Sequence, residues 1–166
     1  AEAAAPQDSY LKLVGHTVAE VQRGVMGVQV WIEWRGRTFS GAGKGLKDNT
    51  HFNNVAENIS AYGLLNHRHT AEMEASLGAS VLFTPHLAPM NRGILATCYA
   101  QATAPCDPLE TLRAAYADEP FVHVSERAPS TKWVLGSNAV HLTARYEGRT
   151  GRILAIAALD NLVKGA

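Results

Sequence analysis

Two strand-like runs near the end of the 166-residue chain constrain its fold more than any other feature. Residues 141–147 and 152–158 are separated by Gly148-Arg-Thr-Gly151, which has the composition of a tight turn. A connection this short joins antiparallel neighbours, whereas parallel strands need a crossover of a dozen residues or more. The sequence therefore predicts an antiparallel hairpin within a larger sheet.

Further strand-like runs precede this hairpin. Apolar and polar residues alternate with a period of two over Val28–Arg35, and Arg35-Gly-Arg37 predicts a hairpin turn before Thr38-Phe39. Other strands are predicted at residues 11–15, 81–85, 93–102, 121–124 and 133–135, with a loop over 85–92.

Three segments predict helices. One runs from about Phe52 to Tyr62 and stops at Gly63, and one is capped by Thr70 and ends at Gly78. The third begins at Asp107-Pro-Leu-Glu110, which supplies an N-cap, an N1 proline and an N3 acid. Together these segments predict an α+β fold: a largely antiparallel, mixed sheet with two to three helices on one face.

Composition excludes several classes of protein. Hydrophobic residues make up 46% of the chain and charged residues 18%, which is typical of a globular domain. The formal net charge is zero, so we expect no nucleic-acid partner, and the apolar runs are shorter than a membrane span needs. We expect a disordered tail at residues 1–9 and a single domain over 10–166.

The two cysteines are predicted to be reduced thiols of a cytoplasmic protein. Cys98 shares one strand face with Ile94, Ala96 and Ala100, so we expect it in the core. Cys106 precedes Asp107, whose charge disfavours a thiolate, and is a poor nucleophile candidate. Two cysteines are also too few for a structural zinc site, and no metal site is expected.

Polar segments give candidate sites, each with a structural alternative. His67-Arg-His69 combines imidazoles for proton transfer with a cation for an anionic substrate, although surface or capping histidines are the more common explanation of such a segment. Arg92 ends a proline-anchored loop that is either a binding surface or a turn. The loop Gly41-Ala-Gly-Lys-Gly45 lacks both Walker and dinucleotide spacing, and Asp160–Ala166 is either a ligand-binding turn or a strand exit.

Several motifs occur together in one order. They are Ser40-Gly-Ala-Gly-Lys44, Asn58-Ile-Ser-Ala-Tyr62 running into His67-Arg-His-Thr70, residues 83–97, Gly136-Ser-Asn138 and residues 160–166. With them the chain from Ser40 to Ala166 resembles the C-terminal, substrate-binding and dimerisation half of N-acetyl-gamma-glutamyl-phosphate reductases. The resemblance implies a fold like the C-terminal domain of semialdehyde and glyceraldehyde-phosphate dehydrogenases. Residues 10–37 match poorly, so we expect a divergent N-terminal β-hairpin at an edge there and the reductase-like part over 38–166.

The resemblance also implies roles for particular residues. That family of oxidoreductases reduces an acyl phosphate to an aldehyde with NADPH, in arginine biosynthesis. His69 is implied as the catalytic acid/base residue, while His67, Arg68 and Arg92 are implied to hold the substrate. Four other residues are implied to approach the NADP cofactor: Ser40, Gly41, Asn161 and Lys164.

Two features of that family are missing from this sequence: the dinucleotide-binding half and the Pro-Gly-Cys-Tyr nucleophile segment. We therefore expect the chain to be inactive alone, with a separate dinucleotide-binding half as a possible partner. The resemblance itself implies a homodimer or homo-oligomer. Two alternatives stay open: a non-catalytic assembly or effector-binding domain, and a small hydrolase or transferase that uses Cys98 and His69.

Overall fold

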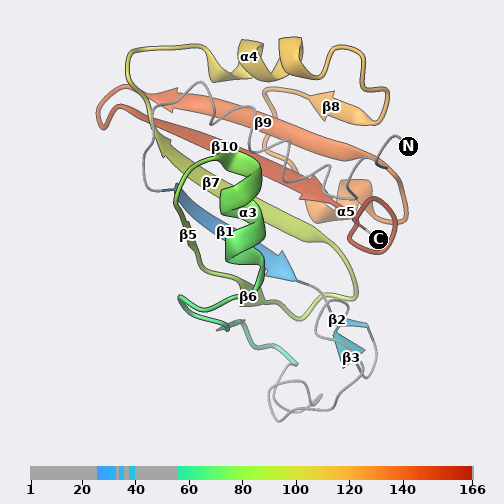
Figure 1. The fold of residues 1–166 in the computed structure, drawn as a ribbon. Helices are drawn as coiled ribbons and strands as arrows, with labels where there is room; N and C mark the ends of the chain where they lie inside the picture. Colours follow the sequence, from blue (N-terminus) through green and yellow to red (C-terminus); the bar gives the residue numbers. More distant parts are fainter. Residues whose placement is uncertain (1–25, 33, 36–37, 40–55, 166) are drawn as a thin grey trace, which may run out of the picture.

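The fold is given by a computed structural model, which describes residues 26–32, 34–35, 38–39 and 56–165 (Figure 1). Its centre is an eight-stranded sheet in the order β4-β6-β1-β7-β10-β9-β8, with β5 also paired to β1. The strands are β1 (Met26–Ile32), β2 (Trp34–Arg35), β3 (Thr38–Phe39), β4 (Ser60–Ala61), β5 (Val81–Phe83), β6 (His86–Leu87), β7 (Ile94–Gln101), β8 (Val122–Val124), β9 (Val140–Glu147) and β10 (Arg152–Leu159). The helices are α3 (His69–Leu77), α4 (Pro108–Ala115) and α5 (Thr131–Val134).

The predicted hairpin forms the middle of this sheet. Strand β10 pairs antiparallel with β9 from Arg152↔Glu147 to Leu159↔Val140, and with β7 on its other side. Gly151 takes a φ of +66° in the connecting turn, a conformation that glycine adopts without strain. The sheet is mixed as predicted, because β8 runs parallel to β9, and β1 runs parallel to β5 and β6.

The expectation of an edge for residues 10–37 is wrong for Met26–Ile32. Strand β1 pairs with β7 on one side and with β5 and β6 on the other, so it lies inside the sheet. The predicted hairpin is confirmed for its described residues, since Trp34 pairs with Phe39 and Arg35 with Thr38. The strand predicted at 11–15 lies outside the described residues, and so does the glycine loop at 41–45.

Two helix ends agree with the sequence and one does not. In α4 the Asp107 side chain accepts hydrogen bonds from the amides of Leu109 and Glu110, which confirms the predicted N-cap. Helix α3 ends at Gly78 with a φ of +63°, as predicted. It begins at His69, however, and the N-cap is Arg68 rather than Thr70, because the Thr70 amide already bonds to the His67 carbonyl in the first turn.

Three predicted segments have a different structure. The described residues 56–62 form no helix, since Glu57 adopts a left-handed φ of +55° and Ser60–Ala61 pair with β6. Residues 133–135 belong largely to α5 instead of a strand, because the chain turns at Ser130 and buries Val134 completely. The loop predicted over 85–92 contains the short strand β6.

One face of the sheet carries the core and the helices. Along β7, buried residues alternate with more exposed ones from Ile94 to Gln101, which confirms the period of two. Met73 of α3 and Leu112 of α4 both belong to the cluster formed by this buried face. The prediction of helices on one face is therefore confirmed, with α5 packed near the end of β10.

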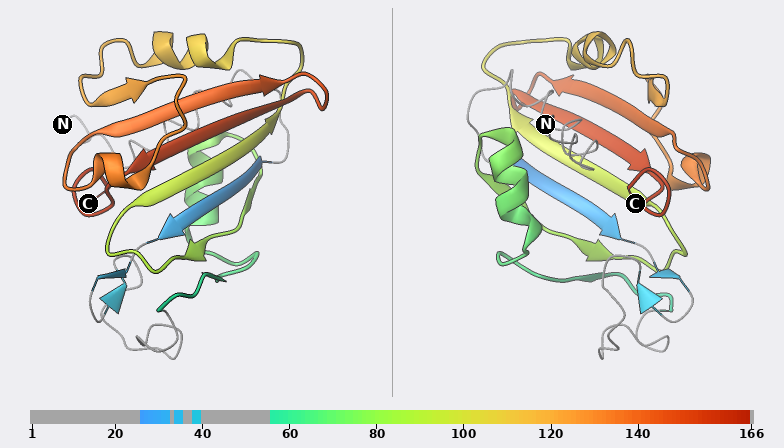
Figure 2. Two further views of the ribbon diagram at one scale, coloured as in Figure 1. Left: turned by 180° about the vertical axis from the view of Figure 1, so that it is seen from behind. Right: turned by 45° about the vertical axis from the view of Figure 1, so that its right-hand side comes forward.

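The opposite face of β7 and β10 is more open. Thr97 and Tyr99 lie beside Ile156 and Leu154 there, and Tyr99 is 43% exposed. Within the described part of the chain no helix covers this central area, as the rear view in Figure 2 shows. An apolar surface is thus left on the sheet. None of the described helices is both long and apolar enough to cross a membrane.

Candidate functional site

The first group of candidate residues lies in and after a tight turn before α3. We call it the histidine group: Tyr62, His67, Arg68, His69 and Phe83. Gly63 opens the turn with a φ of +56°, and a Cβ there would lie 2.9 Å from the His67 ring. The turn therefore needs glycine both for its backbone conformation and for the space that the imidazole occupies.

His67 is held from several sides. Its ring makes edge contacts with those of Tyr62, Phe83 and His69, with centroids 5.4, 5.0 and 4.9 Å away. Its Nδ1 accepts a hydrogen bond from the His69 amide at 3.2 Å, so the neutral ring carries its proton on Nε2. Partial burial lowers the pKa of His67, and the neighbouring His69 and Arg68 charges lower it further. The ring is thus kept neutral near pH 7.

His69 differs from His67 in its partner. Arg68 Nε donates to His69 Nε2 at 3.2 Å, so this nitrogen is the acceptor and the proton resides on Nδ1. The side chain is half-buried at the first position of α3, whereas Arg68 is exposed. The arrangement places one cation beside an imidazole whose basic Nε2 accepts from that cation, and both groups could contact an anionic substrate.

The second group of residues gathers around a buried carboxylate. We call it the aspartate group: Arg92, Gly93, Gly136, Asp160 and Asn161. Asp160 has no exposed surface, and its Oδ2 lies 2.8 Å from Arg92 Nε. The Nε–H is not aimed at that oxygen with hydrogen-bond geometry, so charge rather than an aligned hydrogen bond joins the two side chains.

Asp160 also binds two backbone turns. Its Oδ2 accepts from the Gly136 amide at 2.6 Å, and its Oδ1 accepts from the Leu162 amide at 2.8 Å. Three motifs that are distant in sequence, at 92–93, 136–138 and 160–166, therefore meet at one carboxylate. Sequence reasoning missed Asp160, although an acid directly after an apolar strand run is a recognisable signal of a buried, bonded carboxylate.

Asn161 forms a second link at the same place. Its Oδ1 accepts a hydrogen bond from the Gly93 amide at 2.8 Å. Gly93 has a φ of +121°, and a Cβ there would lie 3.0 Å from Thr131 of α5. Gly165 is similarly close to the Asn161 backbone, since an added Cβ would be 3.0 Å from its Cα. The loop and the C-terminal turn thus fit together through glycines.

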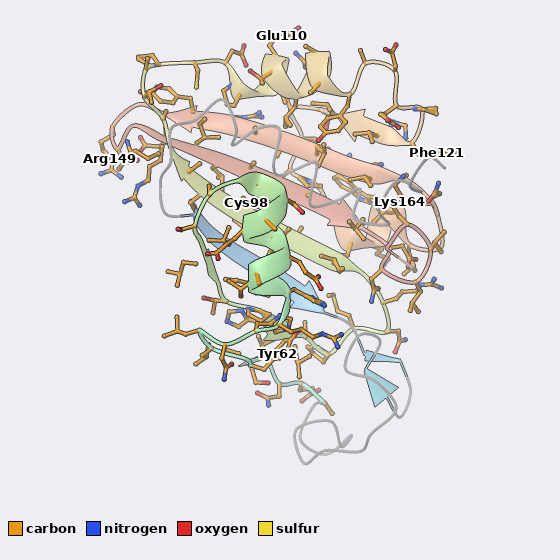
Figure 3. The ribbon with its side chains drawn as sticks, viewed as in Figure 1. Tyr62, Cys98, Glu110, Phe121, Arg149 and Lys164 are labelled. Carbon is orange, nitrogen blue, oxygen red and sulfur yellow. The ribbon has the colours of Figure 1, made fainter. Side chains whose placement is uncertain are left out.

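Lys164, in the same C-terminal turn, lies near an aromatic side chain. Its Nζ is 5.9 Å from the ring centre of Phe121. Both residues are labelled in Figure 3. The structure therefore brings Arg92, Asn161 and the Lys164 turn together. Ser40 and Gly41 lie outside the described residues.

The two groups occupy separate places along the sheet. His67 contacts Phe83 of β5. Phe83 pairs with Val28 of β1, and Val28 pairs on its other side with Cys98 of β7. Arg92 precedes Ile94, which is four residues and roughly 13 Å from Cys98 along β7. In Figure 3, Tyr62 of the first group and Lys164 beside the second are likewise apart.

Cys98 does not fit the role of a nucleophile. The residue is 3% exposed, as predicted for a core thiol, and lies beneath α3 in Figure 3. Burial raises the pKa of its thiol to about 12, so almost no thiolate exists near pH 7. The alternative of a hydrolase or transferase that uses Cys98 and His69 is therefore wrong. Among the described residues, no three His, Cys, Asp or Glu side chains are grouped to hold a metal ion.

Solved structures share this fold. Aspartate semialdehyde dehydrogenase II from Vibrio cholerae matches 95% of the chain with a TM-score of 0.66 and 15% identity, and the chain covers 55% of that protein. A probable aspartate-semialdehyde dehydrogenase from Pseudomonas aeruginosa matches 91% with a TM-score of 0.68, and 54% of it is covered. The fold is therefore that of a semialdehyde dehydrogenase domain, as the sequence predicted.

The family follows from the sequence match. The model described as "Semialdehyde dehydrogenase, dimerisation domain" matches residues 17–161. The chain belongs to this dimerisation-domain family. The match also extends into residues 17–37, which were expected to diverge.

Curated relatives carry a more specific name. Proteins named N-acetyl-gamma-glutamyl-phosphate reductase from Pelotomaculum thermopropionicum and Streptomyces avermitilis are 46% and 50% identical over 139 residues. Both alignments cover 76% of the chain but 40% of the relative, so the chain spans less than half the length of these proteins. The predicted resemblance is thereby confirmed for this part.

Proposed function

We propose that the chain is the substrate-binding and dimerisation domain of an NADPH-dependent N-acetyl-gamma-glutamyl-phosphate reductase, and so serves arginine biosynthesis. The observation that carries the proposal is the 46–50% identity to reductases of that name over three quarters of the chain. The proposed reductase-like part is residues 38–166, preceded by the segment 10–37 and a tail at 1–9. Reduced Cys98 agrees with a cytoplasmic setting.

The histidine group would handle protons and part of the substrate. His69 is the proposed acid/base residue, because its Nε2 is an acceptor beside the exposed Arg68. His67 is fixed by three rings and by the His69 amide, which suits a residue that orients its neighbour and the substrate. Arg68 would contact an anionic group of the substrate.

The aspartate group would hold another anion and face the cofactor. Arg92 is proposed to bind a carboxylate or phosphate of the substrate, since a guanidinium matches both. Asn161, whose Oδ1 accepts from the Gly93 amide, is proposed to approach the nicotinamide. Lys164, together with Ser40 and Gly41, would line the NADP site. Bound NADPH would supply the hydride.

A substrate analogue tests whether both groups serve one ligand. We expect N-acetyl-L-glutamate to shift NMR signals of His69 and Arg92 with a single midpoint. Shifts confined to one group would remove the other from the proposed substrate site.

The chain alone is proposed to be inactive, since its Cys98 is unsuited as a nucleophile and the described residues form no dinucleotide-binding fold. The test is to mix it with a separately produced dinucleotide-binding half of a relative and follow NADPH oxidation with the acyl phosphate. Restored oxidation, with release of aldehyde and phosphate, is the expected result. A folded, tightly bound mixture without activity would instead favour the non-catalytic assembly or effector-binding alternative.

The open face of β7 and β10 is proposed as the homodimer interface. Tyr99, Leu154 and Ile156 give it an apolar centre, and apolar faces of this kind bind a second protein surface. Light scattering at micromolar concentration should give a dimer mass, and Ile156→Glu should give a monomer. Ala114→Glu, on the exposed side of α4, is the matched control and should remain dimeric. A monomeric unmodified chain would contradict the proposal.

A further inference from the structure

We infer that Asp160 is a positioning residue that fixes the Arg92 guanidinium and couples it to the turn carrying Asn161 and Lys164. The inference rests on the proposed function for the identity of the anion that Arg92 binds. It adds a residue to which neither the sequence motifs nor the resemblance assigned a role. Binding of an anion at Arg92 would then change the backbone of the turn that carries Asn161 and Lys164.

The first step of the argument is that one oxygen serves two partners. Asp160 Oδ2 contacts both Arg92 Nε and the Gly136 amide, at 2.8 and 2.6 Å. A fully buried carboxylate has no water to replace either partner, so both are needed to compensate for its lost hydration. A shift of the guanidinium therefore changes the electrostatic environment of the Gly136 turn.

The second step concerns the orientation of Arg92. Its contact with Asp160 is through Nε, the inner nitrogen of the guanidinium, and its side chain is 27% exposed. Bidentate binding of a carboxylate or phosphate also uses the outer nitrogens. The ion pair fixes the position of Nε on the protein side without an aligned hydrogen bond, and so limits the positions that the outer nitrogens can take. A flexible arginine would have to lose that freedom when it binds.

The third step is that the coupling has two parallel links. Arg92 is joined to Asp160, and the next residue Gly93 is joined to Asn161. Both links lie directly beyond the Ile94↔Leu159 pair, at the same end of β7 and β10. The turn after Asp160 is closed on it by hydrogen bonds from the Val163 and Gly165 amides to its carbonyl. Displacement of Arg92 is thus transmitted to the whole turn.

The test uses NMR of the chain with inorganic phosphate as the probe. In the unmodified chain, we expect the Arg92 Nε–H signal to be ordered and to shift with phosphate at the same midpoint as the Gly136 and Leu162 amides. Arg113, whose ion pair with Glu110 is exposed, is the internal control and should be mobile. Asp160→Asn should make Arg92 as mobile as Arg113 and speed hydrogen exchange at Gly136 and Leu162 at least tenfold.

The outcomes separate this inference from the proposed function. An Arg92 side chain as mobile as Arg113 in the unmodified chain would overturn positioning, even if Asp160→Asn did not fold. A phosphate shift at Arg92 that leaves Gly136 and Leu162 unchanged would overturn the coupling. An ordered Arg92 that loses its order in Asp160→Asn, but never responds to phosphate, would support positioning and contradict the proposed anion-binding role. Glu110→Gln should leave the Arg92 signal unchanged.

Discussion

The histidine group and the aspartate group are built in different ways. Most contacts of the first join residues close in sequence, such as His67 with His69 and Gly63, and only Phe83 comes from a later strand. Contacts of the second join residues 24 and 68 positions apart, through Asp160 with Gly136 and Asn161 with Gly93. The first group is partly solvated, whereas the second centres on a buried charge.

Because of this difference, we expect the two groups to differ in how far pH and substitutions affect the stability of the fold. A local turn with half-buried rings is expected to respond to pH and to backbone strain at small cost in global stability. A buried ion pair that joins three segments is expected to be part of the cooperative fold, because its loss leaves an uncompensated charge. The following substitutions test that division.

The largest effect is expected at Arg92. Arg92→Ala leaves the buried Asp160 carboxylate without its cation, and we expect a loss of about 3 kcal/mol in the free energy of unfolding, after allowance for partial exposure of the arginine. Arg113→Ala is the matched control, because its ion pair with Glu110 is exposed and contributes less than about 0.5 kcal/mol. Urea denaturation measures both. Equal losses would remove the distinction between the buried pair and the exposed one.

A smaller effect is expected at Gly63. Gly63→Ala places a Cβ in left-handed backbone and 2.9 Å from the His67 ring, so we expect a loss of about 2 kcal/mol and displaced His67 signals. Gly78→Ala has a similar φ of +63° but no atom within 4 Å, and should cost only the backbone strain, about 1 kcal/mol. If the two variants behave alike, His67 is not packed against this turn.

The smallest effect is the pH dependence of the histidine group. Because the folded pKa of His67 lies below its usual value, the neutral form is favoured by folding. This contribution is complete above the unfolded pKa of about 6.5 and is lost as the pH falls through the folded pKa. The thermal midpoint should therefore decrease between pH 7.5 and 5.5 by less in His67→Gln than in the unmodified chain. Identical decreases would place the pH sensitivity elsewhere, for example at His141, whose pKa burial and His123 also lower.

Local signals predicted much of the fold. The hairpin of β9 and β10 follows from Gly148-Arg-Thr-Gly151 between alternating runs, and the start of α4 follows from Asp107-Pro108. Failures occurred where tertiary contacts replaced local preference. Residues 56–62 have helical spacing, but the Tyr62 amide bonds to the Pro85 carbonyl and β4 pairs with β6. The sequence of one segment alone does not reveal which distant segment it will pair with.

The candidate sites show the same limit. The motif His67-Arg-His69 could be recognised as chemistry because its residues are adjacent, and the structure keeps them together. The meeting of Arg92 with Asp160 depends on the β7–β10 register, which sets Ile94 opposite Leu159. That register is a property of the folded sheet, so the sequence indicated the separate motifs but not their common carboxylate.

The position of the aspartate group at the end of a strand pair has a consequence for motion. Strand ends usually open first, since their last hydrogen bonds have neighbours on one side only. Here the pair Ile94↔Leu159 is followed at once by the Arg92–Asp160 and Gly93–Asn161 links. Beyond the pair Gln101↔Arg152 the segments are joined at the Gly151 carbonyl, by the Ala102 amide and the exposed Gln101 side chain, beside an exposed turn and without a buried ion pair. Transient opening of β7 from β10 should therefore start at the Gln101 end and stop before the Arg92 end, so that the candidate anion-binding residue stays in place while the far side of the sheet fluctuates.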